Sequence, residues 1–298
     1  MGPYRDRMSR EKPTAQTLAR RMVQAASARV DATEAAAVRN DPDGVHRHRT
    51  AVRRLRTVVA AVGRLSDAAE IDALRGALKP WGRLLGEARD AEVRAERAAD
   101  VLAELGIDDA DARRRLVGDE RADGRHLHAR IVEAHASETA QRRIQLVRQA
   151  GLRLELDAPD AKGGKTFRKL LRREGEKLRR AARRQDGSLE RLHEIRKAAR
   201  RLRYLAEAIE DAAPESRDRG VHDLGRAAKR VHKLLGDHRD DLLLAERARE
   251  LHRRAFVAQE RTAPYDAVVV HVTARADTTV AGLPRALKRV KKAAARVG

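Results

Sequence analysis

The stretch HRHRTAVRRLR, from His46 to Arg56, occurs again in nearly the same form as HEIRKAARRLR, from His193 to Arg203. Seven of the eleven positions are identical, and five of these seven are histidine or arginine. An α-helix advances about 100° per residue, so this spacing gathers the basic residues on one side and the apolar residues on the other. Each copy therefore predicts an amphipathic helix with one cationic face and one face turned toward a helical core.

The cationic face of each predicted helix is a narrow stripe. The first stripe contains His46, Arg49, Arg53 and Arg56 and continues at Arg64, and the second contains His193, Arg196, Arg200 and Arg203. Arg54 and Arg201 fall off the stripes, and we expect them to support or border the bundle. Like charges one turn apart repel by about 0.2–0.5 kcal/mol per pair, yet the first stripe contains no acid. Its recurrence favours a binding surface, and a solvated face of a purely structural scaffold is the alternative.

A second pair of segments repeats in the same order. KPWGRLLGEARDAEVRAERA, from Lys79, aligns without a gap to KRVHKLLGDHRDDLLLAERA, from Lys229. Two repeats with offsets of 147 and 150 residues indicate an internal duplication. The second repeat adds to the candidate basic surface Lys79, Arg83 and Arg89, with their counterparts Lys229, Lys233 and Arg239. We expect Asp90 and Asp240 to orient Arg89 and Arg239, with an ordinary intrahelical ion pair as the alternative.

Apolar residues recur at helical spacing through most of the chain. The pattern predicts helices at 14–39, 45–65, 68–105, 124–150, 164–185, 189–212, 216–253 and 262–297, the last interrupted around Gly282 and Pro284 and the third kinked at Pro80. The segment LRLELD, 152–157, alternates like a strand, but one strand cannot form a sheet, so we assign it to a linker. The prediction is an all-α chain with two pseudo-symmetric antiparallel four-helix bundles, 10–150 and 164–297, joined by the linker 151–163.

The charge balance indicates a polyanionic partner. Lysine plus arginine number 66 against 45 aspartates and glutamates, giving a formal net charge of +21. Aromatic residues make up only 2%, whereas single-stranded nucleic acid is usually held by stacking its bases on aromatic rings. A polyanion without bases is therefore favoured, and a nucleic-acid or general polyanion binder is the alternative.

No signature of catalysis or of a bound cofactor stands out in the sequence. The chain has no cysteine, and the histidines of HRH (46–48) and HLH (126–128) face different sides of a helix, so we expect no metal site and no cofactor. A phosphohistidine reaction would need a nucleotide-binding signature, and no P-loop is present. We expect no catalytic residue, and His46 and His193 to donate hydrogen bonds to phosphate, with a role at the edge of the core as the alternative.

A third basic segment, KTFRKLLRREGEKLRRAARR, contributes further candidates at Lys165, Arg168, Lys169 and Arg172. Its amphipathic pattern places some of them on the basic surface without deciding which. No window approaches the roughly 20 apolar residues of a membrane span, so we expect a cytoplasmic protein with no membrane partner.

The paired HxxRxxxRRLR segments, together with LLGEARDAEV and LLGDHRDDLL, resemble the CHAD domain, the conserved histidine α-helical domain. The resemblance spans residues 10–297 and implies two four-helix bundles with a basic cavity or pore between them that binds inorganic polyphosphate. Family members are associated with polyphosphate granules. CHAD domains are sometimes fused to a CYTH triphosphatase domain marked by ExExK, but the nearest match here, EGEKL (174–178), has leucine in place of lysine. The expected function is polyphosphate binding without cleavage, by a stand-alone CHAD domain.

Overall fold

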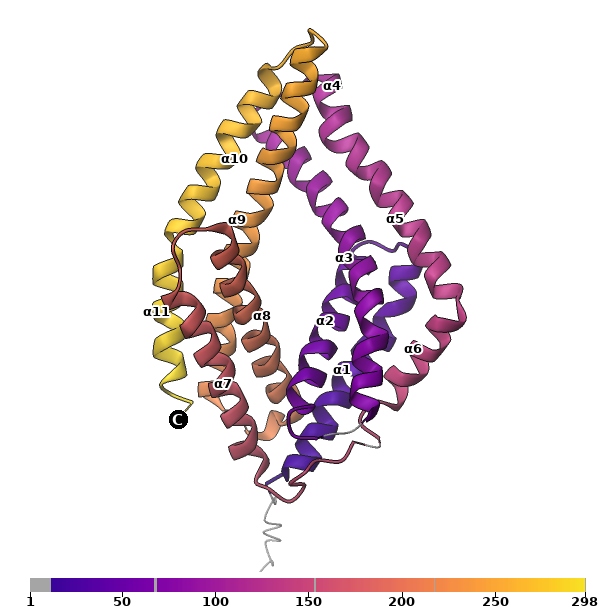
Figure 1. Cartoon of the computed structure of the whole chain (residues 1–298), viewed down its shortest axis with the longest axis vertical. Coiled ribbons are helices and arrows are strands. Elements are labelled where there is room, and N and C mark those ends of the chain that lie inside the picture. Colours follow the sequence, from indigo (N-terminus) through magenta and orange to yellow (C-terminus); the bar gives the residue numbers. More distant parts are fainter. Residues whose placement is uncertain (1–11, 67–68, 153, 217, 298) are drawn as a thin grey trace, which may run out of the picture.

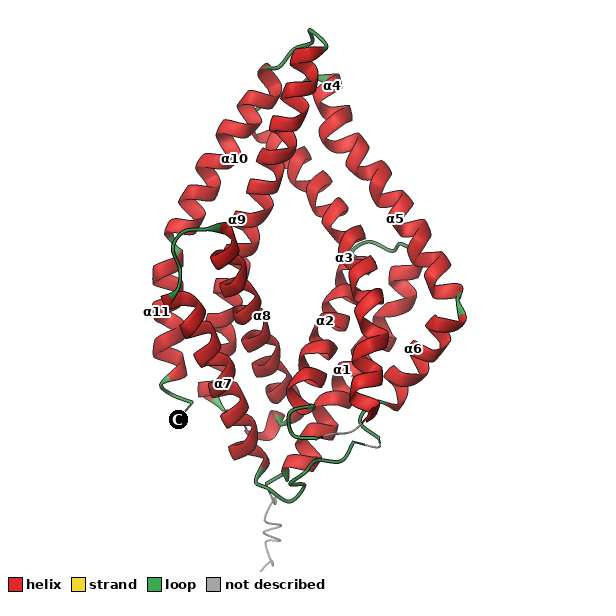
Figure 2. Ribbon diagram, viewed as in Figure 1, coloured by secondary structure: helices red, strands yellow, loops and turns green. Residues whose placement is uncertain are grey.

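Helices form all the regular elements in the part of the chain that the computed structural model describes, residues 12–66, 69–152, 154–216 and 218–297. The first half contains α1 (Ala15–Val38), α2 (Gly44–Val62), α3 (Ala69–Glu104), α4 (Ala110–Arg113), a π-helical turn (Arg114–Gly118), α5 (Asp119–Ala136) and α6 (Glu138–Gln149). The second contains α7 (Gly163–Arg183), α8 (Leu189–Ala212), a 3₁₀ turn (Pro214–Ser216), α9 (Arg219–Val257), α10 (Ala263–Ala281) and α11 (Leu283–Ala294). The predicted all-α class is confirmed (Figures 1 and 2).

The order of helices is similar in the two halves. In each half, two helices of about 20 residues precede one long helix, α3 or α9, and a broken fourth element packs along that long helix (Figure 1). The interruption predicted around Gly282 is confirmed, since α10 ends at Ala281 and α11 begins at Leu283. The duplication itself and the domain limits stay predictions, and residues 10 and 11 lie outside the described residues.

The predicted start of the fourth helix, at residue 124, is wrong. Helical structure begins at Ala110 and continues through GDERADG, because a glycine within a helix costs only about 1 kcal/mol and the buried Leu116 and Val117 hold this segment against the core. The helix breaks instead at Ser137, whose extended backbone and hydroxyl cap the start of α6 at the amide of Ala140. The described residues of 152–157 form no strand, as expected for a linker, and Leu154 and Leu156 are buried.

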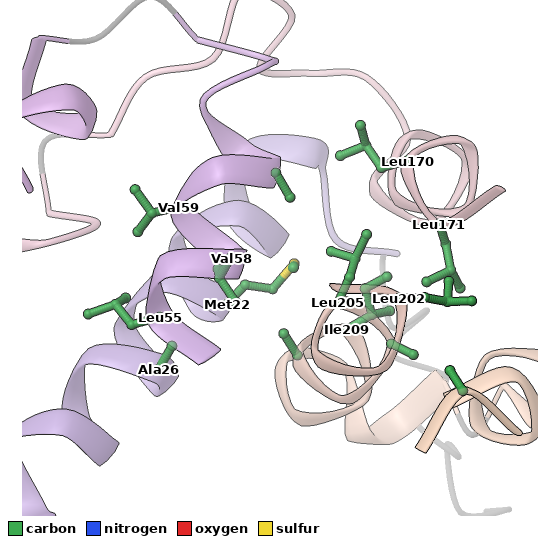
Figure 3. Close-up of a cluster of buried hydrophobic side chains, with 14 of the residues drawn as sticks. Met22, Ala26, Leu55, Val58, Val59, Leu170, Leu171, Leu202, Leu205 and Ile209 are labelled. Atoms are coloured by element: carbon green, nitrogen blue, oxygen red, sulfur yellow. The ribbon is translucent and has the colours of Figure 1, made fainter. Parts of the chain in front are cut away.

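Two apolar cores hold the halves together. The larger core joins α1, α2 and α3 to α7, α8, α9 and α11, and Figure 3 shows Met22 of α1 pointing toward Leu202 and Leu205 of α8. The smaller core joins the C-terminal parts of α3 and α9 to α10 and to residues 112–117. The halves therefore meet at both ends of the elongated molecule, and the ribbons diverge between these ends (Figure 1).

Ion pairs reinforce both contacts between the halves. At the smaller core, the fully buried carboxylate of Asp241 accepts from Arg97 of α3, with atoms 2.6 Å apart, and from Arg275 of α10 at 2.7 Å. At the larger core, Arg54 of α2 lies 2.6 Å from Asp211 of α8. This position for Arg54 agrees with its expected supporting role.

Candidate functional site

A cavity of about 900 Å³ opens between α2 and α3 on one side and α7 and α8 on the other. We call it the basic cavity, because nine lysines and arginines line it against four acids. The cations are Arg49, Arg53, Arg56, Arg64, Arg75, Lys79, Arg83, Arg200 and Arg201, and the acids are Asp72, Glu87, Asp90 and Glu174. Six of the predicted residues are thus brought together in one cavity, five from the first half and Arg200 from the second.

Several of the lining cations have no carboxylate partner. Among the described residues, no ion pair joins a carboxylate to Arg53, Arg56, Lys79, Arg83 or Arg200. Burial lowers the pKa of Arg53 to about 9, and repulsion from Arg49 and Arg200 adds to the effect. Burial likewise lowers the pKa of Arg200 to about 10, with repulsion from Arg196. The cations that line the cavity therefore outnumber the acids that neutralise them, and such an excess of positive charge attracts an anion.

Arg49 and Arg196 occupy corresponding positions in the two halves. The guanidinium of each passes beside a glycine of the neighbouring long helix, and a Cβ atom added at Gly86 or Gly236 would lie 3.8 Å from the Nε of the arginine beside it. Both Nε–H groups are buried and donate no hydrogen bond to any described atom. Asp90 accepts from Arg49 at 2.9 Å, so it orients a stripe arginine of α2 and not the expected Arg89, which pairs with Glu92 and Glu96.

The second half does not reproduce the cavity wall of the first. A Cβ atom added at Gly82 would lie 3.1 Å from Arg56 Nη1, so this glycine leaves room for Arg56 to line the cavity. The corresponding residue in the second half is His232, whose pKa burial and the nearby Arg196 lower to about 3. Arg203, the counterpart of Arg56, donates instead to Glu207 at 2.7 Å and lies outside the cavity lining.

The remaining predicted residues lie elsewhere. Arg89 is neutralised by Glu92 and Glu96, with atoms 3.0 and 3.1 Å apart. Outside the lining of the basic cavity lie His46, Lys165, Lys169, Arg172, Lys229 and Lys233, all exposed, and Arg168, which pairs with Asp218 at 2.7 Å. His193, Arg196 and Arg239 line a separate pocket. The helical wheel placed these residues on basic faces, but packing and nearby acids separated them.

The face of α7 that meets the basic cavity is different from the predicted one. Glu174 lines the cavity, and Lys177, Arg180 and Arg184 line an adjoining pocket of about 430 Å³, together with Lys197 and Arg201. Arg201 therefore lines both pockets, and its ion pair with Glu174 of α7, at 3.3 Å, agrees with an expected supporting role. The spacing of Lys177, Arg180 and Arg184 at i, i+3 and i+7 was visible in the sequence.

Glu174 is a buried carboxylate among these cations, with a side chain only 4% exposed. It lies 2.7 Å from Arg64, 2.7 Å from Lys177 and 3.3 Å from Arg201. Burial by itself would raise the pKa of Glu174, but hydrogen bonds from Lys177 and Arg64 hold it below the ordinary value. The charged carboxylate thus neutralises part of the wall where the two pockets meet.

His48, the second histidine of HRH, has a structural environment. It is fully buried, Trp81 donates its indole N–H to Nε2 at 2.8 Å, and Thr33 lies 3.0 Å from Nδ1. Since Nε2 accepts, the ring is neutral, in keeping with burial that lowers the His48 pKa to about 3. In the second half, Ile195 takes the position of His48 and Val231 that of Trp81, and both are buried and apolar.

Comparison with known proteins finds a matching protein family and solved structures with a similar fold. The family model of the CHAD domain matches residues 21–249. The crystal structure of the CHAD domain from the plant Ricinus communis aligns with a TM-score of 0.69 and 20% identity over 95% of this chain and 92% of that chain. PptA from Streptomyces chartreusis aligns with a TM-score of 0.68 and 18% identity over 94% and 99% of the respective chains. At such identities these likenesses show the fold alone.

Curated relatives are larger. An uncharacterized protein of Mycobacterium tuberculosis, found in two strains, is 29% identical over 274 residues, covering 86% of this chain. The alignment covers 50% of that protein, so the chain spans about half the length of the curated relatives it matches. None of the helices within the described residues combines the length and hydropathy needed to span a bilayer.

Proposed function

We propose that this chain, which belongs to the CHAD domain family, binds inorganic polyphosphate in the basic cavity without cleaving it. The observation that carries the proposal is the set of lining cations that no described carboxylate neutralises, Arg53, Arg56, Lys79, Arg83 and Arg200. They project from three helices packed into one core, so they are held at fixed positions before any ligand arrives. Preorganised cations lose little entropy on binding.

The chemistry of the cavity matches a flexible chain of phosphates. Arginine presents a planar fork of N–H donors that pairs with phosphate oxygens, and lysine adds compact charges between the forks. All four lining acids are already paired with arginines, Asp72, Asp90 and Glu174 with cations of the lining and Glu87 with Arg130 outside it. The cavity is thereby suited to holding a polyanion by charge.

The lining favours polyphosphate over single-stranded nucleic acid. No aromatic side chain is among the described residues that line the basic cavity, whereas each stacked base gains about 1–3 kcal/mol from an aromatic platform. The adjoining pocket of Lys177, Arg180 and Arg184 shares Arg201 with the basic cavity and offers a continuation for a longer chain. Long polyphosphate should therefore bind more tightly than tripolyphosphate.

The test is a calorimetric titration with long-chain polyphosphate, tripolyphosphate and single-stranded DNA. The double variant Arg53→Gln/Arg200→Gln should lose affinity by at least about a hundredfold, because hydrogen bonds to charged groups contribute about 1.5–3 kcal/mol each. The matched control Arg285→Gln/Arg289→Gln removes the same charge from the exposed face of α11 and should bind normally. Equal weakening by both variants would mean that only net charge matters, and preferential binding of DNA would overturn the proposal.

Salt dependence gives a second measurement. By analogy with DNA, contacts to about 6–10 phosphates should lower the affinity by about 10³–10⁵ between 50 and 200 mM salt. An affinity that does not change with salt concentration would contradict binding by charge. On the same basis we propose that the protein is cytoplasmic and associates with polyphosphate granules, which a fluorescent fusion would show and the Arg53→Gln/Arg200→Gln variant should lose.

A further inference from the structure

A third cavity, of about 660 Å³, lies between α8 and α9 and shares no lining residue with the basic cavity. We call it the leucine pocket, because five leucines of the two helices line it, among them Leu189, Leu242 and Leu243. Arg196 and Arg239 line the same pocket, as do the acids Glu190 and Glu246. A volume of this size is typical of small-molecule sites, which combine an apolar wall with a few polar groups.

The corresponding surface of the first half has a different character. Aligning the repeats places Glu92 at the position of Leu242, and there Glu92 lies 3.0 Å from Arg89, the counterpart of Arg239. In the second half the leucine leaves Arg239 without this partner. Within the described residues, its only carboxylate neighbour in ion-pair range is Asp240, at 4.0 Å.

A second acid pairs with Arg89 in the first half, but its counterpart does not pair with Arg239 in the second. In the first half Glu96 lies 3.1 Å from Arg89, whereas no ion pair among the described residues joins its counterpart Glu246 to Arg239. Arg196, the other arginine of the pocket, has a buried Nε–H that donates to no described atom. The leucine pocket therefore contains donors that its own acids do not satisfy, whereas the corresponding arginine of the first half is paired twice.

Leu189 adds apolar surface to this pocket. It is the first residue of α8, its side chain is 63% exposed, and the repeat places Pro42 at the corresponding position of the first half. A large apolar side chain left in solvent beside a pocket provides surface that a ligand could cover. The second half thus has a pocket that is both apolar and cationic, whereas the first half has a surface of paired charges.

These two properties together select one class of ligand. A polyphosphate gains nothing from leucine side chains, and an uncharged hydrocarbon gains nothing from arginine. A molecule with one anionic head and an apolar chain satisfies both. We infer that the leucine pocket binds a monomeric anionic amphiphile of the class of medium-chain carboxylates, with its head at Arg196 and Arg239 and its chain along the leucines. The inference does not depend on the proposed function, because the two cavities share no lining residue.

Two substitutions test the pocket. Leu242→Glu installs the residue found at the corresponding position of the first half. Leu189→Asp puts an acid beside the pocket at an exposed position, where an acid at the start of a helix is favourable and folding should not be disturbed. Val270→Glu is the control, because it places an acid on α10 where the native side chain is 70% exposed. Circular dichroism would verify that each variant is folded.

Calorimetry with decanoate, below its micelle concentration, provides the readout. The native protein should bind one decanoate, and either pocket variant should weaken binding by about tenfold or more, while Val270→Glu leaves it unchanged. Decyltrimethylammonium, with the same chain and the opposite charge, should not bind. Binding of both amphiphiles alike, unchanged decanoate affinity in both pocket variants, or binding to anionic phospholipid vesicles but not to monomeric decanoate would overturn the inference.

Polyphosphate titration of the same variants separates the two proposals. Leu242→Glu should retain polyphosphate affinity if the basic cavity is the polyphosphate site. Loss of polyphosphate binding together with decanoate binding would show that one site serves both ligands and would overturn the separate pocket.

Discussion

Removing two cations from the basic cavity should stabilise the empty protein while weakening its binding of polyphosphate. The pKa of Arg53 is lowered to about 9 and that of Arg200 to about 10, because burial and neighbouring arginines disfavour the charged forms. Below these values both side chains are charged and destabilise the folded state. Stability should rise only as the pH increases from about 9 toward the ordinary arginine pKa, where the folded protein binds fewer protons than the unfolded chain.

The size of the effect follows from these values. One pKa unit corresponds to about 1.4 kcal/mol, which sets an upper limit of about 5 kcal/mol for Arg53. Because the guanidinium borders an open cavity, screening reduces the expected gain to about 1–2 kcal/mol per residue. Glutamine keeps most of the aliphatic stem, so Arg53→Gln/Arg200→Gln should raise the free energy of unfolding by about 2–4 kcal/mol in the absence of polyphosphate.

Urea unfolding followed by circular dichroism at neutral pH measures this gain. The control Arg285→Gln/Arg289→Gln should change the free energy of unfolding by less than about 0.5 kcal/mol, as is usual for surface substitutions. Saturating polyphosphate should stabilise the native protein and the control but not the cavity variant. A cavity variant that is less stable than the native protein when empty would refute the reasoning, because it would show that these arginines are satisfied without a ligand.

Three further outcomes are expected. Asp241→Asn should lower the free energy of unfolding by about 3–5 kcal/mol, since it leaves Arg97 and Arg275 without their buried carboxylate, and a loss below about 1 kcal/mol in urea unfolding would contradict this role. Glu174→Gln should tighten polyphosphate binding, because it frees cations at the cavity wall. The slope of log affinity against log salt should become steeper by the amount expected for about one more phosphate contact, and weaker binding in calorimetry would contradict this. Acidification from about pH 7 to pH 5 should destabilise the protein by about 2 kcal/mol through His48. In this range His48 takes up a proton in the unfolded chain but stays neutral in the folded protein, where it is buried. His48→Gln cannot titrate and should show a shallower decline in urea unfolding, so equal declines would exclude this origin.

Local patterns were enough to predict the helical class, the two cationic stripes and the interruption at Gly282. Apolar periodicity, glycine and proline act within a few residues, and they specify which side chains share a helix face whatever the helix packs against. The sequence analysis missed the break at Ser137 because the glycines of 118–124 suggested a turn there. The weak helix propensity of these glycines is outweighed by the packing of the buried Leu116 and Val117. The ion pair between Arg89 and Glu92 could have been predicted from the sequence, since Glu92 follows Arg89 by three residues on the same helix.

The sequence by itself determined an all-helical, strongly basic chain with repeated arginine stripes, because helix formation and net charge depend on nearby residues and composition. Only the tertiary structure decided which arginines face the basic cavity. Arg201 of α8 lies in the cavity wall while Arg203 of the same helix pairs with Glu207, and Glu174 from α7 neutralises Arg201 as well as Arg64, which follows α2. A helical wheel specifies the angle between residues of one helix, but the orientation of that helix and many of the carboxylates that reach it come from segments distant in the sequence.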